Sequence, residues 1–346
     1  MQKEGVFMEN IGEKRVILSG IRATGKMHLG NYLGAIKNFV ELSLDPKNNC
    51  FYFIANLHTL TTRTDPNAMR HDLREIVLDY LAAGLDPGVA TIYAQSSVPE
   101  TTELAWLLAC ITPVNAIASM PHFKEKKDQL EGRGGSDNAG LLTYPVLMAA
   151  DILGPRANLV PVGQDQHPHV ELARDLARRF NNLYGETFPI PELLEGEGIR
   201  VPGLDKSGKM GKSEESGAIF LSDPPKIVEK KILTAPTDPK RVRRTDPGNP
   251  ADCNIYLFHQ LLSTQDELAW VCQGCLGAHI GCADCKRVVI GHVNEILWPL
   301  QERRADFSAK PAGFVEEILH EGGIRARSRI SETVTEAKSL AGVPSY

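Results

Sequence analysis

The sequence predicts an α/β protein in which a Rossmann-like, doubly wound parallel sheet is followed by a smaller helical C-terminal domain. Short β-rich runs alternate with longer helical periods in the first half of the chain, which is typical of parallel strands joined by crossover helices. After about residue 214 such runs become rare, and six prolines gather within residues 223–253 before further helical stretches begin. This change of pattern indicates a domain boundary.

Each element of this fold is predicted from its local pattern. Four β-rich runs predict strands over residues 15–18, 50–54, 90–94 and 158–162. Apolar residues at helical spacing predict helices over 30–42, 66–83, 103–110, 144–153, 167–180, 255–262, 285–307 and 313–340. We divide the chain into an N-terminal extension (1–14), the Rossmann-like domain (15–214), a helical domain with a cysteine cluster (215–307) and a C-terminal helical segment (308–346).

Composition excludes several classes of protein. Of the 346 residues, 42% are hydrophobic and 23% are charged, so the chain can bury a core and suggests roughly two domains. The net charge of −5 gives no general case for a protein that coats DNA or a membrane surface. No apolar run reaches the roughly 18 residues of a membrane span, and residues 1–15 lack the apolar core of a secretory signal. We therefore expect a cytoplasmic protein without membrane contact.

Residues 19–31 lie between the first predicted strand and the first predicted helix, where an open α/β sheet binds nucleotides. The dinucleotide-binding pattern G-x-G-x-x-G does not occur in the chain. The stretch instead contains His28-Leu29-Gly30-Asn31, in which a donor side chain precedes a glycine that lets a planar base approach the backbone. These four residues alone are a weak signal, because an ordinary turn with a capping polar residue has the same pattern.

A second signal is the run Lys209-Met210-Gly211-Lys212-Ser213, on a loop after the sheet region. The run is not a P-loop, because position 206, where that motif requires glycine, is lysine. Two lysines three positions apart can instead follow a migrating pyrophosphate as charge develops on it. A solvated, lysine-rich surface is the alternative for this run alone, and the His28 segment in the same chain favours nucleotide chemistry.

Together the two runs resemble the H-I-G-H and K-M-S-K-S signatures of class I aminoacyl-tRNA synthetases. Further blocks are similar to those of tryptophanyl-tRNA synthetases, in the same order and over nearly the whole chain from about residue 15. These blocks are 19–21 with 30–35, 141–145 with 148–153, 160–166 and 171–181. The sequence departs from the common family pattern at Arg22-Ala23, where many members have Gln-Pro, and at Asn31, Gln164 and Gly211.

The resemblance implies an enzyme, tryptophan–tRNA ligase, that joins L-tryptophan to tRNA(Trp) through a tryptophanyl-adenylate, with ATP and Mg²⁺. It further implies a homodimer, a catalytic domain over 15–214 and an anticodon-binding domain over 215–307. Basic clusters at 240–244 and 325–329 are the expected path of the tRNA phosphates. Two alternatives stay open: tyrosyl-tRNA synthetase, which shares both signatures, and a paralogue that binds tRNA or protein without catalysis.

The resemblance also implies roles for single residues. Catalysis would come from positioning and from positive charge beside the departing pyrophosphate, without a protein nucleophile. The implied catalytic residues are His28, Lys126, Lys209 and Lys212. The implied ATP-binding residues are Arg22, Ala23, Thr24, Gly30, Asn31, Gly163, Gln164, Asp165, Val201, Lys209, Met210, Gly211, Lys212 and Ser213.

Tyr144, Met148 and Asp151 fall at helical spacing and therefore share one helix face. This face is either a core-facing stripe that ends in an exposed acid, or a flat apolar slot with one acceptor for a ring donor. The residues themselves do not separate an indole N–H from a phenol O–H, whereas the resemblance implies the indole of tryptophan. By the same resemblance the remaining pocket residues are Gln166, His58, Leu18, Gly20, Val160 and Val162.

Five of the seven cysteines lie within 33 residues and predict a metal site: Cys253, Cys272, Cys275, Cys282 and Cys285. The pairs Cys272-x2-Cys275 and Cys282-x2-Cys285 would suit tetrahedral zinc. The set Cys253, Cys275, Cys282 and Cys285 is similar to the pattern of bacterial tryptophanyl-tRNA synthetases that hold a 4Fe–4S cluster. Cysteine-only ligation fits both groups, and the resemblance favours the cluster. Cys50 and Cys110 are expected to be core thiols.

Overall fold

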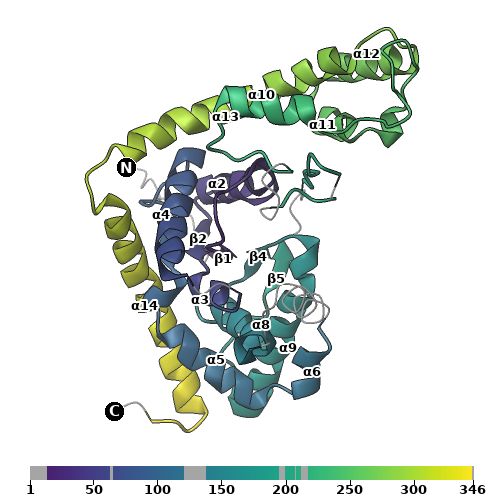
Figure 1. The fold of residues 1–346 in the computed structure, drawn as a ribbon. Coiled ribbons are helices and arrows are strands. Elements are labelled where there is room, and N and C mark those ends of the chain that lie inside the picture. Colours follow the sequence, from purple (N-terminus) through teal and green to yellow (C-terminus); the bar gives the residue numbers. More distant parts are fainter. Residues whose placement is uncertain are drawn as a thin grey trace, which may run out of the picture.

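The computed structural model describes residues 14–62, 65–120, 138–194, 199–206, 208–211 and 217–344. Five parallel strands form one sheet in the order β3-β2-β1-β4-β5, and this order reverses direction between β1 and β4 (Figure 1). The predicted doubly wound, Rossmann-like sheet is therefore confirmed. The strands are β1 (Arg15–Ile21), β2 (Asn48–Ile54), β3 (Thr91–Ala94), β4 (Leu159–Pro161) and β5 (Glu192–Leu194). The prediction omits β5, whose Glu-Leu-Leu sequence has no β-branched residue.

Helices cover both faces of the sheet and make up the C-terminal region (Figure 1). Those of the sheet region are α1 (Leu29–Asn31), the π-helix η1 (Tyr32–Ile36), α2 (Lys37–Leu44), α3 (Asn56–Thr59), α4 (Pro66–Ala83), η2 (Gln95–Ser97), α5 (Glu100–Ile111), α6 (Val114–Ala118), α8 (Ala139–Leu153), η3 (Gln164–Gln166) and α9 (His167–Tyr184). Those that follow are α10 (Pro225–Thr234), η4 (Pro250–Asp252), α11 (Asn254–Leu262), α12 (Gln265–Leu276), α13 (Cys282–Ser308) and α14 (Phe314–Leu340). None of the helices described is long and apolar enough to cross a membrane.

The helix predicted over 30–42 is wrong as one regular helix, since it consists of α1, a π-helical segment and α2. Two glycines bring this segment close to the chain near residue 200. A Cβ at Gly34 would lie 3.1 Å from the Ile199 carbonyl oxygen, and one at Gly30 would lie 3.5 Å from Val201 Cβ. Irregular turns of this kind occur often at functional sites.

Alternating residues of the strands feed two hydrophobic cores, one on each face of the sheet. In β1, Ile17 enters one core, whereas Val16 and Leu18 enter the other. The second core also holds Val160 of β4 and the apolar face of α8. Cys50 is buried as expected, but the prediction for Cys110 is wrong, because its thiol is exposed. Helix α5 turns Leu104, Leu108 and Ile111 inward, which leaves Cys110 on the outer face.

The C-terminal region extends away from the sheet and then returns to it (Figure 1). Helices α10, α11 and α12 gather along the first part of α13, and α14 then runs back along the body of the protein. Helix α14 packs against β3, α5 and α4. Its approach to β3 depends on Gly322, because a Cβ there would lie 1.8 Å from the Ile92 carbonyl oxygen.

Candidate active site

The candidate site lies at the carboxyl ends of β1 and β4, where the strand order reverses. The Ser19 hydroxyl donates to the Pro161 carbonyl over 2.9 Å and so fastens the two strand ends together. Chain segments that leave the sheet at such a point diverge to opposite faces, and the crevice between them is where doubly wound sheets bind ligands. Residues 22–28 follow β1 here, and residues 162–166 follow β4.

The first signature begins the helical segment after β1. His28 caps α1: its Nδ1 accepts from the Asn31 amide over 3.2 Å, and Asn31 Oδ1 accepts from the His28 amide over 3.1 Å. The ring is buried and lies against Gly30, where a Cβ would come within 3.1 Å of it. His28 therefore does cap the helix, as the alternative interpretation of this turn expects. The same two hydrogen bonds fix the orientation of the imidazole.

The second signature lies on a hairpin formed by residues 201–206 and 208–211, which we call the signature hairpin. The Met210 amide donates to the Val201 carbonyl over 2.8 Å, and Pro202 pairs with Lys209 in an antiparallel bridge. Lys209 and Gly211 are exposed, whereas Val201 and Met210 are buried. Lys212 and Ser213 of this signature, and the predicted catalytic Lys126, lie outside the described residues.

The structure brings the two signatures together. Val201 of the signature hairpin lies close to Gly30, where a Cβ would come within 3.5 Å of the Val201 Cβ. The chain after the hairpin returns as an antiparallel partner of the first signature, with the Leu29 amide donating to the Ile219 carbonyl over 2.8 Å and the Leu221 amide donating to the Met27 carbonyl over 2.9 Å. The arrangement places exposed Lys209 on a support that is built directly on the His28 segment.

Arg22 and Ala23, where the sequence departs from the family pattern, are hydrogen-bonded to residues in and just after the short helix α3. The Arg22 Nη2 donates to the Thr62 hydroxyl over 2.6 Å, and the Ala23 amide donates to the Thr59 hydroxyl over 3.0 Å. Burial lowers the pKa of Arg22, with Tyr144 acting in the opposite direction. Thr24 turns back on itself, with its amide donating to the Arg22 carbonyl over 2.9 Å. This loop therefore joins the strand end to the predicted tryptophan pocket.

The centre of that pocket is the carboxylate of Asp151, on α8. Its side chain is 3% exposed, so the interpretation of an apolar stripe that ends in an exposed acid is wrong. His58 Nε2 donates to Asp151 Oδ2 over 2.7 Å, and Gln95 Nε2 donates to Oδ1 over 2.8 Å and to Oδ2 over 2.9 Å. Burial raises the pKa of Asp151, and the hydrogen bonds from His58 and Gln95 oppose this shift.

Aromatic and apolar groups surround this carboxylate. Tyr144 stands edge-on to the His58 ring at 6.2 Å, and its hydroxyl lies 2.9 Å from His169 Nε2. Of the predicted pocket wall, Leu18 and Val160 are buried in the second core, where Met148 and Val162 are partly buried. Gly20 lies against another aromatic ring, because a Cβ there would come within 2.7 Å of the Phe53 side chain.

Gln95 and His169 are missed by the sequence analysis. Gln95 directly follows β3, so its position at the carboxyl edge of the sheet is a signal that could have identified it. Gln95 also accepts at Oε1 from the Leu57 and His58 amides, and so it orients both the carboxylate and the helix that carries His58. His169 lies inside α9 and has no comparable sequence signal.

Three of the predicted ATP-binding residues follow β4 in an exposed turn. Gly163, Gln164 and Asp165 are exposed. The Gln166 side-chain amide donates to Asp165 Oδ2 over 2.8 Å, so this predicted pocket residue is tied to the predicted ATP residue beside it. A Cβ at Gly163 would come within 2.8 Å of Asp165 Oδ1, so a side chain there would displace the Asp165 carboxylate.

Four of the five clustered cysteines form one group. Burial raises the pKa of Cys285 to about 12, and Cys253, Cys275 and Cys282 contribute to the rise. Cys272 instead interacts with the Tyr256 hydroxyl. The described residues contain no set of three His, Cys, Asp or Glu side chains already arranged to hold a metal ion.

Other side chains reach the sulfur atoms of this group. Arg241 Nη1 donates to Cys275 Sγ over 3.8 Å, and His259 Nε2 lies 3.2 Å from Cys285 Sγ. Arg241 Nη2 also donates to the Ile280 and Arg244 carbonyls. This residue of the predicted tRNA-binding cluster at 240–244 therefore links its own loop to the chain before α13.

The second basic cluster, residues 325–329, also makes hydrogen bonds and an ion pair with other parts of the chain. Arg325 and Arg329 donate to the Pro87 and Pro155 carbonyls, over 2.7 Å and 2.5 Å, and Arg327 pairs with Glu100 over 2.7 Å. These contacts fasten α14 to the sheet region, a structural use that the charge pattern does not reveal.

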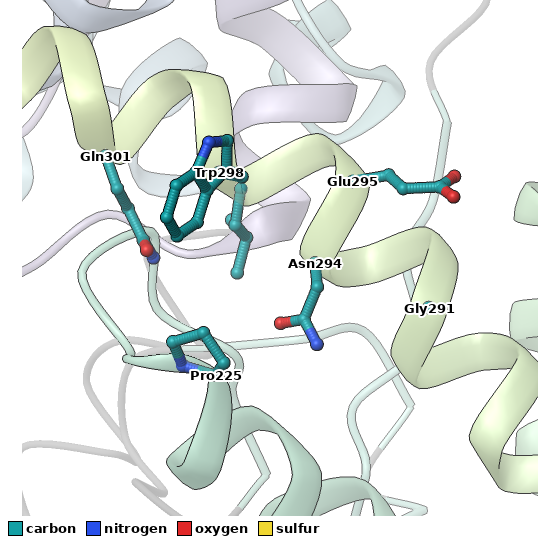
Figure 2. Close-up of a pocket in the computed structure, with 7 residues that line it drawn as sticks. Pro225, Gly291, Asn294, Glu295, Trp298 and Gln301 are labelled. Atoms are coloured by element: carbon teal, nitrogen blue, oxygen red, sulfur yellow. The ribbon is translucent and has the colours of Figure 1, made fainter.

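A surface pocket of about 460 Å³ lies apart from these residues, between the start of α10 and one face of α13 (Figure 2). Its lining residues are Pro225, Gly291, Asn294, Glu295, Leu297, Trp298 and Gln301. Gln301 donates from its amide to the Leu221 and Asp223 carbonyls, over 2.9 Å and 3.0 Å. Gln301, which lines this pocket, therefore also stabilises the segment around Leu221 that pairs with the first signature.

A doubly wound sheet whose reversal point carries these two paired signatures defines a class I aminoacyl-tRNA synthetase core. The chain belongs to the family described as tRNA synthetases class I (W and Y), which it matches over residues 10–298. It is 42% identical to the tryptophan–tRNA ligase of Deinococcus radiodurans over 329 residues, which cover 94% of this chain and 98% of that protein. It is likewise 42% identical to the tryptophan–tRNA ligase of Thermotoga maritima, covering 93% of this chain and 97% of that one.

A solved structure supports the same family. Tryptophanyl-tRNA synthetase from Campylobacter jejuni, complexed with ADP and tryptophan, superposes with a TM-score of 0.81 at 32% sequence identity. The match covers 94% of this chain and 99% of that one.

Proposed function

We propose that this chain is a tryptophan–tRNA ligase, which forms tryptophanyl-adenylate from L-tryptophan and ATP and then transfers the tryptophanyl group to tRNA(Trp). The observation that carries the proposal is the buried Asp151 carboxylate, oriented by His58 and Gln95, beside two paired synthetase signatures. The relatives described above are tryptophan–tRNA ligases, which supports the same assignment.

In the first step an oxygen of the tryptophan carboxylate attacks the α-phosphorus of ATP, and the bond to the β-phosphate breaks to release pyrophosphate. The chain supplies no nucleophile; its residues hold the two substrates in line and stabilise the departing charge. We assign the charge stabilisation to His28 and Lys209, together with Lys126 and Lys212. Mg²⁺ would accompany ATP and neutralise its phosphate oxygens.

In the second step a ribose hydroxyl of the terminal adenosine of tRNA(Trp) attacks the adenylate carbonyl, and AMP leaves. We assign the ribose of ATP to Asp165, with Gly163 allowing its close approach. Exposure of these two residues after β4 supports that assignment, because a substrate can reach them from solvent. We assign the adenine to the backbone of Gly30 and Val201, which lie next to each other.

Tryptophan is the proposed amino acid because its ring N–H would satisfy the buried Asp151 acceptor. A substrate that lacks a ring donor, such as phenylalanine, would leave that acceptor with less compensation for its burial and should be rejected strongly. Tyrosine also carries a donor, so tyrosyl-tRNA synthetase is the competing assignment.

Tryptophan-dependent exchange of pyrophosphate into ATP tests the function directly. The expected result is exchange with tryptophan, negligible exchange with tyrosine, and charging of tRNA(Trp). Exchange with tyrosine alone would assign the chain to the tyrosyl enzymes. Lack of exchange with either amino acid, in a folded protein that still binds tRNA, would identify a non-catalytic paralogue.

We further propose that Cys253, Cys275, Cys282 and Cys285 hold a 4Fe–4S cluster. The pKa values of Cys275 and Cys285 are both raised by Cys253 and Cys282, which supports this set over the two Cys-x2-Cys pairs, and Cys272 interacts with Tyr256 instead. When bound, such a group would cross-link the start of α11 to α12 and α13. Protein purified without oxygen should be brown and contain iron and sulfide, and Cys253→Ser should bleach it whereas Cys272→Ser should not. One stoichiometric zinc in a colourless protein, insensitive to Cys253→Ser, would favour the zinc pairs.

The homodimer is also a proposal, and the outer face of α5 and α6 supports it. Trp106 is 71% exposed and Val114 is 67% exposed, with the exposed Cys110 between them. We propose that a second copy of this chain binds to this face. Light scattering should report a dimer that Trp106→Glu converts to a monomer, whereas Trp298→Glu, on the exposed surface of α13, should leave the dimer intact. A wild-type monomer, or a Trp106→Glu dimer, would contradict this interface.

A further inference from the structure

The segment that carries Cys253 contacts the signature hairpin directly. Asn254, which follows Cys253, is buried, and its side-chain amide donates to the Gly203 carbonyl over 2.5 Å. Lys206 Nζ donates to the Asp252 carbonyl over 3.1 Å and to the Thr237 carbonyl over 2.9 Å. The two residues that flank Cys253 are therefore both bonded to the hairpin.

These contacts act at the turn of the hairpin. The Gly203 amide donates to the Gly208 carbonyl over 2.8 Å and closes the turn. Lys206 and Gly208 both have left-handed backbone conformations there, with φ of 64° and 95°. Lys209 follows directly, so a displacement of the turn would move Lys209 with it.

We propose that Asn254 and Lys206 are positioning residues for adenylate formation. They hold the signature hairpin from the C-terminal region, while Val201 holds it against the His28 segment. Lys209 is thereby set between two supports, one built on the sheet and one on the chain around Cys253. The proposal rests on the proposed function, since it assigns these residues to the adenylation step.

The chemistry of the contacts explains why their loss should affect the rate. Asn254→Ala would leave the buried Gly203 carbonyl without this donor, and the hairpin would shift to find another partner. Lys206 makes its bonds at the surface, and its loss would release the turn from the chain around Cys253. A displacement of about 1 Å in a catalytic group can reduce a rate on the order of a hundredfold. Because Lys209 acts on charge that develops in the transition state, this loss should appear in kcat more than in the KM for tryptophan.

Four variants of the full-length protein test the proposal by tryptophan-dependent pyrophosphate exchange. We expect Asn254→Ala and Lys206→Met to lower kcat by about tenfold to a hundredfold, with the KM for tryptophan nearly unchanged. Lys206→Arg keeps a charged donor and should restore most of the rate. Lys338→Met is the matched control, because Lys338 pairs with Glu103 over 2.6 Å rather than with the hairpin.

Amide hydrogen exchange supplies a readout that does not depend on activity. Asn254→Ala and Lys206→Met should expose the Gly203 and Met210 amides to faster exchange than in wild type, while Lys338→Met should not. Unchanged kcat and unchanged exchange in a folded Asn254→Ala protein would overturn the positioning role. Lack of activity in the wild type itself would overturn the proposed function instead, and the amide exchange would still decide the contact.

Discussion

At the scale of single residues, the role proposed for Asp151 places the recognition of the substrate ring in one buried carboxylate. Asp151→Asn keeps the shape of the side chain but replaces an anionic acceptor with a neutral amide, whose nitrogen also faces the Gln95 donor. We expect kcat/KM for tryptophan to fall by an amount equivalent to about 1–3 kcal/mol, the scale of a hydrogen bond to a charged group. Pyrophosphate exchange measures this loss, and an unchanged kcat/KM would remove Asp151 from the pocket.

Lys212 tests the charge stabilisation proposed for the second signature. Lys212→Ala should lower the rate of adenylate formation far more than it raises the KM for tryptophan, because its charge is required as pyrophosphate separates. Single-turnover measurements of adenylate formation separate the two effects. Weaker tryptophan binding at an unchanged rate would contradict the assignment.

The sequence predicts candidate residues best where neighbours in the chain are also neighbours in the site. His28, Gly30 and Asn31 form one capped turn, so their pattern contains most of their local geometry. Gln95 also orients the Asp151 carboxylate, but the two residues are 56 positions apart along the chain, so no local sequence pattern predicts their contact. The roles of the predicted site residues remain predictions that the variants above test.

At the scale of elements, the residues that begin and end a helix explain why some predicted helix bounds are accurate. Helix α4 matches its predicted bounds, because Asp65 caps its start, Pro66 occupies its first turn and Gly84 ends it in a left-handed conformation. Helix α10 lies within the proline-rich stretch 223–253, for which the sequence predicts no helix, yet Pro225 occupies its first turn, where proline is tolerated. Helix α12 is missed as well, although Thr264 and Glu267 form a capping box at its start.

The packing of α14 on β3 gives a prediction at this scale. Gly322→Ala would push its Cβ into the Ile92 carbonyl and should lower the free energy of unfolding by about 1–3 kcal/mol, the usual cost of overpacking. Gly291→Ala, in α13, is the control: nothing lies within 4 Å of its Cβ, so it should raise stability by about 0.5–1 kcal/mol. Denaturant titration of both variants measures the difference, and equal effects would show that α14 does not need this close approach.

At the scale of the whole molecule, α13 connects the C-terminal helices to the sheet region through an ion-pair cluster. Arg304 Nε pairs with Asp79 over 2.7 Å and its Nη2 with Glu75 over 2.5 Å, both on α4. The Asp79 side chain is only 6% exposed, so removal of the guanidinium would leave a buried carboxylate without this counter-charge. No sequence pattern reveals this pair, because the partners are more than 200 positions apart.

Arg304→Ala should therefore lower the free energy of unfolding toward the roughly 3–5 kcal/mol that a broken buried pair costs. Arg15→Ala breaks an exposed pair with Asp45 and should cost about 1 kcal/mol or less. Chemical denaturation with a fluorescence probe measures both variants. Similar losses for the two would show that the α13–α4 junction adds little to stability.

The return of α14 to β3 has a consequence for the way the protein is made. Among the described residues β3 is an edge strand, and a strand in that place offers unpaired backbone groups to any other strand that meets it. The helix that covers it consists of residues 314–340, which leave the ribosome after every strand described here has been synthesised. A nascent chain, or one cut before Phe314, would present a completed sheet with an open edge, so translation of the last helix closes the interval in which the protein is most exposed to aggregation.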